Sequence, residues 1–275
     1  MIIEETLRQL KMNGKKGLIV YITAGDPNLY VTEALVCAIA KAGADIIELG
    51  IPFSDPLADG VTIQQASERA LKAGTDVSKI LSTIVSIRAK TSIPLALMTY
   101  YNPVFAFGLE RFVRECKSIG VNGFIIPDLP LEESEEFRKI TDKAGLELIS
   151  FLTPVSTPER ISTIIKKARG FIYCVSVLGV TGVRKDFSSE ISNMLEKIKD
   201  RTNKPLAIGF GISNPEQAQE AAKYADAVIV GSAIVKLIEN YQEDLPTLLQ
   251  QVTNFVKSLK EGLISREHFK MEFLK

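Results

Sequence analysis

The sequence predicts an α/β protein, and more specifically a (β/α)8 TIM barrel with an N-terminal extra helix. Eight short apolar runs alternate with amphipathic segments of helical period along the chain. Most runs are apolar throughout, which is typical of parallel strands covered on both faces. Their number and spacing match a barrel of about 250 residues. An open doubly wound sheet is the competing fold. No G-x-G-x-x-G motif follows the first run, which weighs against its dinucleotide-binding form.

The strands are predicted where apolar runs end at glycine, proline or polar turn residues. The first run, residues 17–23, ends at Ala24-Gly25-Asp26-Pro27, a strong turn signal. The predicted strands are residues 17–23, 44–49, 94–99, 123–126, 146–152, 171–177, 205–208 and 227–230.

The helices are predicted from the 3.6-residue period and from their end signals. Residues 4–11 form a short amphipathic helix before the first strand. Asn28 can cap the helix over 29–41, and Pro158 suits the first turn of a helix. The other predicted helices cover residues 62–73, 77–90, 108–119, 132–144, 159–168, 188–200, 215–223, 232–240 and 246–259. We expect a single domain over 1–275, in which 260–275 is a charged tail.

Composition excludes several classes of function. The 33 basic and 33 acidic residues cancel, so no basic excess points to nucleic acid. No apolar run approaches a membrane span and no signal peptide is visible, so we expect a cytoplasmic protein. Cys37, Cys116 and Cys174 have no metal or redox spacing. With His268 as the only histidine, a Ser-His-Asp triad or a multi-histidine metal site is nearly excluded, and we expect no metal.

One stretch, residues 48–60, concentrates carboxylates at a strand end. Glu48 lies within an apolar run, where burying a carboxylate is costly unless it is paired or used. Pro52 and Pro56 stiffen the loop that follows, and Asp59 ends it before a helical pattern. The alternative is structural: Glu48 pairs with a buried cation, and Asp55 and Asp59 are turn or cap residues.

Aromatic residues accompany this carboxylate. Alternation along the first two strands puts Tyr21 and Glu48 on the faces that we expect to line the barrel interior. Tyr100, Tyr173 and Phe210 lie at or near strand ends, where barrels carry their active sites. Tyr173 can equally be a core residue. Together they indicate a flat apolar ligand with a polar handle.

Glycines at the ends of the last two strands indicate a phosphate site. Gly209-Phe210-Gly211-Ile212-Ser213 follows the seventh strand, and Gly231-Ser232-Ala233 follows the eighth and opens a short helix. Backbone N–H groups and a helix N-terminus bind anions there in many barrels. Gly182 in the sixth loop can add another N–H group. Each glycine alone is explained by turn geometry, but three such glycines in adjacent loops favour a phosphate site.

Elimination narrows the reaction class. A Schiff-base aldolase needs a lysine at a strand end, but Lys204 precedes its strand and Lys185 lies in a loop. A zinc aldolase needs histidines. Proton transfer by carboxylates remains. It can break a carbon–carbon bond if the leaving group is its own electron sink, as an indole ring protonated at carbon is.

Six stretches in order resemble the tryptophan synthase alpha chain family, over residues 1–260. They are residues 48–60, YYNPVF at 100–105, PDLP at 127–130, GVTG at 179–182, GFGIS at 209–213 and GSAIVK at 231–236. The resemblance implies a cofactor-free lyase of tryptophan biosynthesis, which cleaves indole-3-glycerol phosphate to indole and glyceraldehyde 3-phosphate. The tail beyond 260 has no counterpart in this pattern.

The same resemblance implies roles for individual residues. Glu48 matches the acid/base, Asp59 matches the carboxylate that accepts the indole N–H, and Thr181 matches the residue that orients Asp59. Tyr21 stands where we expect phenylalanine in the pocket floor. Gly182, Gly211, Gly231 and Ser232 match the phosphate site, and Tyr100, Ile125, Tyr173 and Phe210 match indole-pocket positions.

The resemblance also implies a partner. A beta chain carrying pyridoxal phosphate is expected to form an alpha2beta2 heterotetramer and to dock on the face containing Pro52, Phe53 and Pro56. Alternatively, Phe53 only packs inside its loop. Two other functions stay open at this point: a phosphosugar isomerase on the same barrel, and a non-catalytic subunit that senses a phosphate ligand.

Overall fold

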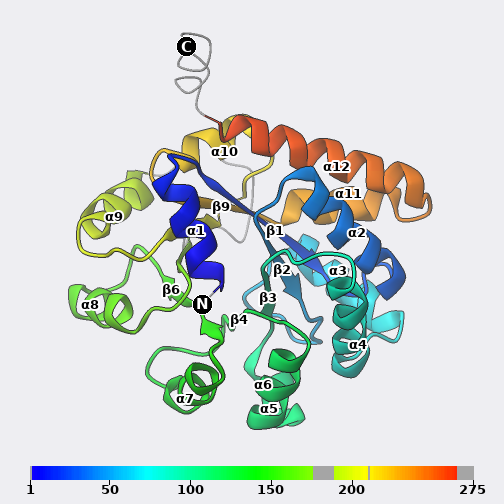
Figure 1. The fold of residues 1–275 in the computed structure, drawn as a ribbon, viewed down its shortest axis with the longest axis horizontal. Coiled ribbons are helices and arrows are strands. Elements are labelled where there is room, and N and C mark those ends of the chain that lie inside the picture. The colour runs from blue at the N-terminus through cyan, green and yellow to red at the C-terminus, as the bar shows by residue number, and fades with distance from the viewer. Residues whose placement is uncertain (1, 176–188, 210, 265–275) are drawn as a thin grey trace.

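The computed structural model describes residues 2–175, 189–209 and 211–264, and in it a ring of parallel strands is surrounded by helices (Figure 1). The strands are β1 Gly17–Thr23, β2 Ile46–Gly50, β3 Leu95–Met98, β4 Gly123–Ile125, β5 Glu147–Leu148, β6 Ser150–Leu152, β7 Ile172–Val175, β8 Leu206–Gly209 and β9 Ala227–Val230.

The strands close into a barrel. Their order is β5-β4-β3-β2-β1-β9-β8-β7-β6, with every pair parallel. Only Ile149 separates β5 from β6, and its N–H donates to the Phe124 carbonyl at 2.9 Å. The two short strands therefore act as one, which pairs with β4 by its first half and with β7 by its second. This is the strand predicted over 146–152, and the predicted (β/α)8 TIM barrel is confirmed.

The helices of the described residues follow the predicted order with one addition. The seven-residue α5 was not predicted, because its aromatic residues and an internal proline hide a helical period. The helices are α1 Ile2–Met12, α2 Leu29–Ala42, α3 Val61–Lys72, α4 Val77–Arg88, α5 Tyr101–Phe107, α6 Leu109–Ser118, α7 Glu135–Ala144, α8 Pro158–Lys167, α9 Ser189–Lys199, α10 Pro215–Ala222, α11 Ser232–Tyr241 and α12 Leu245–Gly262.

Local signals explain most helix ends. The Asn28 side chain accepts a hydrogen bond from the Val31 N–H, which confirms the predicted cap of α2. Several predicted boundaries differ by one or two residues, and two helix ends differ by three. Helix α7 begins at Glu135 rather than 132, because residues 131–134 form a turn. Helix α12 continues to Gly262 and takes in the start of the predicted tail, whereas residues 265–275 lie outside the described part. No helix among the described residues is long and apolar enough to cross a membrane.

The register of the first strands sets the interior of the barrel. Strands β1 and β2 pair Ile19 with Ile46 and Tyr21 with Glu48. Ile19 and Ile46 are fully buried in the cluster that fills the barrel. Tyr21 and Glu48 lie two residues further along the same faces, as predicted, and so above this cluster at the C-terminal end.

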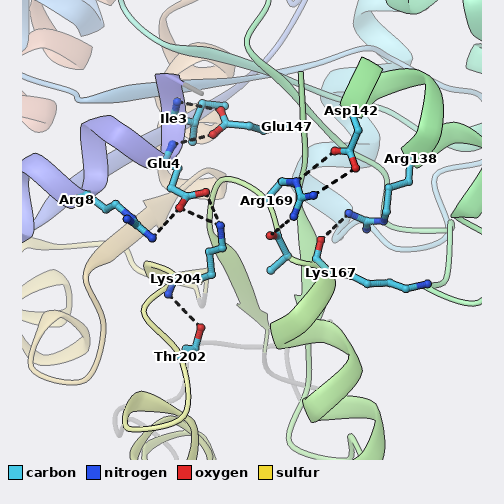
Figure 2. Close-up of polar contacts among 11 residues, drawn as sticks. Ile3, Glu4, Arg8, Arg138, Asp142, Glu147, Lys167, Arg169, Thr202 and Lys204 are labelled. Carbon is cyan, nitrogen blue, oxygen red and sulfur yellow. Dashed lines mark hydrogen bonds and ion pairs between the residues drawn. The ribbon is translucent and has the colours of Figure 1, made fainter. Parts of the chain in front are cut away.

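Helix α1 covers the opposite, N-terminal end of the barrel (Figure 1). Ile3 and Leu7 pack into the interior cluster. The buried Glu147 carboxylate accepts hydrogen bonds from the Ile3 and Glu4 N–H groups at 2.9 and 3.0 Å, and Glu4 pairs with Lys204 at 2.7 Å (Figure 2). A carboxylate at a helix N-terminus satisfies N–H groups that have no partner within the helix. Lys204 is therefore tied to the end of the barrel remote from the strand-end loops.

An ion pair to a buried carboxylate fixes α3 against the rest of the barrel. Arg69 on α3 donates from Nε and Nη2 to the two oxygens of Asp26, both at 2.8 Å, and Asp26 is completely buried. Nη1 of Arg69 also lies 3.7 Å from Glu239 on α11. The pair joins the turn after β1 to the helix that follows Asp59 and to the helix that begins at Ser232.

Candidate active site

A cavity of about 400 Å³ opens at the C-terminal ends of the strands. It brings together residues that the sequence places far apart. Of the predicted site residues, Tyr21, Glu48, Asp59, Tyr173, Gly211, Gly231 and Ser232 line it. They come from β1, β2, the β2–α3 loop, β7 and the segments that follow β8 and β9.

Glu48 is the deepest carboxylate of the cavity. Its side chain is 1% exposed, and neither carboxyl oxygen has a hydrogen-bond partner among the described residues. Burial raises the pKa of Glu48 to about 8, and the nearby Asp59 contributes to the shift. A carboxyl group whose pKa lies near neutral pH can both release and accept a proton, as an acid/base catalyst must.

Asp59 is held over the cavity by its own loop. Its N–H donates to the Pro56 carbonyl at 3.0 Å, and the Gln64 side chain donates to the Asp59 carbonyl at 2.9 Å. Burial raises the pKa of Asp59 to about 6, against a hydrogen bond with Tyr100 that lowers it. Asp59 is therefore mostly ionised at neutral pH, whereas Glu48 is mostly protonated.

Tyr100 supports this loop and does not line the cavity. Its hydroxyl accepts a hydrogen bond from the Ala58 N–H at 2.8 Å, and its ring centroid lies 5.3 Å from that of Phe53. Ile125 is not in the cavity wall either, because it is fully buried in the interior cluster. Both residues were predicted at indole-pocket positions; neither lines the cavity in the structure, and their contact with a ligand stays a prediction.

Apolar side chains that the sequence did not reveal complete the wall. The Phe151 and Tyr173 ring centroids are 5.1 Å apart at a tilt of 31°. Strand pairing gives the reason, since Phe151 on β6 is the register partner of Tyr173 on β7. The sequence did carry a signal for Phe151, because it lies in the predicted strand before that of Tyr173, which was already a predicted site residue. The other apolar residues of the wall are Ala58, Ile63, Met98, Pro127, Val175, Ile212 and Ile229.

Two glycines make room for the tyrosines. A Cβ atom at Gly50 would clash with the Tyr21 hydroxyl, and one at Gly209 would lie 2.6 Å from the Tyr173 hydroxyl oxygen. The Tyr21 hydroxyl also shares a hydrogen bond with Thr23 at 3.1 Å. These contacts fix both rings, so the cavity offers a preformed slot for a flat ligand.

The opposite side of the cavity can receive an anion. Gly211 has φ +48°, and a Cβ atom there would meet nothing within 4 Å. Gly231 precedes α11 without a side-chain cap, so the first N–H groups of this ten-residue helix have no partner within the helix. This arrangement suits phosphate.

Three predicted site residues, Thr181, Gly182 and Phe210, lie outside the described residues.

Among the residues that the structure describes, no group of three or more His, Cys, Asp or Glu side chains is arranged to hold a metal ion.

Comparisons with known proteins agree on one family. The family described as "Tryptophan synthase alpha chain" matches residues 7–264. The alpha chain of Geotalea daltonii is 50% identical over 262 residues, 95% of this chain and 98% of its own length. That of Geobacter sulfurreducens is 48% identical over 261 residues, 95% of this chain and 98% of its own. Among solved structures, tryptophan synthase subunit alpha from Legionella pneumophila aligns with a TM-score of 0.88 at 36% identity, covering 95% of this chain and 97% of that one. A chain of M. tuberculosis tryptophan synthase, in its aminoacrylate-bound form, aligns with a TM-score of 0.84 at 31% identity, covering 95% of this chain and 98% of that one.

Proposed function

Because this chain belongs to the tryptophan synthase alpha chain family, we propose that it cleaves indole-3-glycerol phosphate to indole and glyceraldehyde 3-phosphate. This carbon–carbon lyase step is the alpha reaction of L-tryptophan biosynthesis. The observation that carries the proposal is the buried, unpartnered Glu48 carboxyl in a cavity that also holds Asp59. The matches do not favour a phosphosugar isomerase or a ligand sensor. We also propose a cytoplasmic location, in keeping with a biosynthetic role.

Glu48 supplies the proton transfers in this proposal. Glu48, which is mostly protonated at neutral pH, delivers its proton to the ring carbon that bears the glycerol chain, so that the ring becomes cationic and Glu48 becomes a carboxylate. Glu48 then takes the proton of the adjacent glycerol hydroxyl, whose oxygen forms the aldehyde C=O. The electrons of the broken carbon–carbon bond return to the ring, which leaves as neutral indole. The net change moves one proton from the hydroxyl to the ring carbon, which suits one group with a pKa of about 8.

Asp59 serves the ring cation. Its carboxylate accepts the indole N–H and stabilises the positive charge that develops when the ring carbon is protonated. A pKa of about 6 keeps it mostly ionised at neutral pH. The adjacent rings of Phe151 and Tyr173 hold the indole plane, and the Gly211 and Gly231 segments hold the phosphate.

The direct test is to incubate the purified protein with indole-3-glycerol phosphate and to measure released indole. Folded protein that binds the substrate but releases no indole, with or without a beta chain, would overturn the proposal.

The phosphate site makes a separate prediction. Gly211→Asp should reduce binding of glyceraldehyde 3-phosphate by about tenfold or more, because a carboxylate would face the phosphate. Free indole, which lacks phosphate, should bind nearly as before. Asp and Asn tolerate a positive φ better than other residues, so the fold should survive.

Gly211→Asn is the matched control, with the same size and backbone demand but no charge. Calorimetric titration of both ligands into the three proteins measures the effect. Equal loss of both ligands in both variants would show that bulk or misfolding, rather than phosphate repulsion, is responsible.

We also propose a beta-chain partner and an alpha2beta2 assembly, since the family works with a beta chain. The structure offers exposed apolar side chains at the cavity end: Leu57 is 92% exposed, Phe105 65% and Val155 75%. Each lies in a segment that follows a strand. Pro52, by contrast, is buried and Phe53 is half-buried against Tyr100, so Leu57 is the more accessible apolar group of this loop.

Docking on this end should also activate cleavage. Asp59 depends on a loop of two prolines and on Tyr100, and small errors in the position of a catalytic group cost large factors in rate. Titrating the chain with its cognate beta chain should therefore give a stable complex and faster indole release. Leu57→Asp should weaken the complex, whereas Val85→Asp, on an exposed helix position, serves as control. A complex without any change in cleavage rate would contradict activation.

A further inference from the structure

A second cavity, of about 300 Å³, lies beside the candidate active site. It is bounded by the segment after β4, by α7, by β5 and β6, and by α8. Pro127 and Phe151 belong to the walls of both cavities. Several polar side chains line this second cavity although it lies outside the candidate active site. They are Asp128, Ser134, Arg138, Ser150 and Arg160.

Arg138 is the buried charge of this cavity. It is 7% exposed and forms no ion pair among the described residues. Its Nη1 donates to the Lys167 carbonyl at the end of α8 at 2.9 Å (Figure 2). Its Nη2 makes only a long contact of 3.4 Å with the Ser150 hydroxyl, and its buried Nε has no partner in the described part of the chain. Burial lowers the pKa of Arg138, as expected for a charge with too little compensation.

The unpartnered Nε and the weakly bonded Nη2 form one edge of the guanidinium group. Nε and Nη2 point the same way, and this edge binds carboxylate or phosphate through two parallel hydrogen bonds. Arg69 shows the same edge in use, since its Nε and Nη2 hold the two oxygens of Asp26 at 2.8 Å each. In Arg88 the Nε donates to the Gly120 carbonyl at 3.0 Å. On the corresponding edge of Arg138, Nε has no partner among the described residues and Nη2 has only the long Ser150 contact.

The neighbouring carboxylates are already committed. Asp142 pairs with Arg169 at 3.3 Å, and Glu135 pairs with Lys167 at 3.2 Å. Two further carboxylates are also engaged: Asp128 accepts the Tyr101 N–H at 2.9 Å, and Glu132 pairs with Arg160 at 2.5 Å. Within the described part of the chain, no carboxylate therefore forms an ion pair or hydrogen bond with Arg138.

We propose that the second cavity binds a small oxyanion of the carboxylate or phosphate class on the Nε–Nη2 edge of Arg138. The anion replaces the long Ser150 contact and reaches Nε by a small rotation of the guanidinium plane. This site is separate from the phosphate end of the first cavity, which is built from backbone N–H groups of Gly211 and α11. It does not depend on the proposed reaction.

The test observes Arg138 directly. Arginine Nε–H signals are recorded by ¹⁵N NMR on the full chain while inorganic phosphate or acetate is added, with chloride at matched ionic strength as reference. Arg138→Lys identifies the signal by its disappearance. If that variant does not fold, Ser150→Ala identifies it by its shift. Titrations are repeated in Gly211→Asp, where the first phosphate site is blocked.

The expected result is a saturable downfield movement of the Arg138 Nε–H signal, in the millimolar range, that persists in Gly211→Asp. The Arg69 and Arg88 signals should stay in place, since their Nε groups already have acceptors. Saturation by phosphate but not acetate would assign a tetrahedral anion, and the reverse a planar carboxylate. An Arg138 signal that does not move, or that moves together with Arg69 and Arg88, would show that Arg138 only caps α8 and would overturn the proposal.

Discussion

Glu48→Gln should lower kcat for indole release by about 10²–10⁴-fold while indole-3-glycerol phosphate still binds. Glutamine keeps the size of the side chain, but it cannot exchange a proton with the hydroxyl or the ring carbon. Single-turnover measurements of indole, together with a binding titration of the substrate, separate the two effects. Near-normal turnover would exclude Glu48 as the acid/base.

The same variant should change the pH dependence of stability. Folding raises the pKa of Glu48 from 4.5 to about 8. Between these values the folded protein holds a proton that the unfolded chain has released, so stability falls as pH rises from about 4.5 to 8. Glutamine carries no such proton. Glu48→Gln should therefore gain stability over the parent protein across this range, reaching a few kcal/mol above pH 8. A difference in unfolding free energy between the two proteins that stays constant from pH 5 to 9 would contradict this.

Arg69→Met should destabilise the fold by about 3–5 kcal/mol, because it leaves the Asp26 carboxylate buried without its partner. Methionine retains much of the apolar length of arginine. Urea unfolding measures the loss. Asp26 can take up a proton once Arg69 is removed, so the loss should shrink towards acid pH.

Lys72→Met is the matched control on the same helix. Lys72 pairs with Glu68, but these side chains are 73% and 62% exposed. Such an exposed pair is screened by solvent and contributes little to stability. If Arg69→Met cost no more than Lys72→Met, the pair of Arg69 with Asp26 would not be what holds α3.

The barrel could be predicted from sequence because parallel strands covered on both faces need apolar residues at every position. Glu48 stood out for the same reason, as a carboxylate within such a run. Helix α5 could not be found, because seven residues with Pro103 inside carry no readable period. The division of one predicted strand into β5 and β6 depends on its two different neighbours, which sequence does not display.

A site residue could be predicted from sequence where a charged side chain stands in an apolar strand, as Glu48 does. An apolar site residue in an apolar strand could not be told from a core residue. Phe151 and Met98 were missed because an inward apolar residue looks alike whether it fills the core or walls a cavity. Ile125 shows the converse, since an expected pocket residue lies in the core. Arg138 gave no signal at all, because its surroundings are assembled from α7, α8 and β6, which meet only in the folded chain. Thr181, Gly182 and Phe210 remain predictions.

The closure of the barrel floor by α1 has a consequence for synthesis. Glu147 and Lys204, which hold the start of this helix, follow it by more than 140 and by 200 residues. At about 5–20 residues per second, Lys204 is made roughly 10–40 s after Glu4. Until then the apolar stripe of Ile3 and Leu7 has no barrel to enter. Helix α1 is thus synthesised well before the residues that hold its start, and during that interval it exposes an apolar stripe of the kind that chaperones bind.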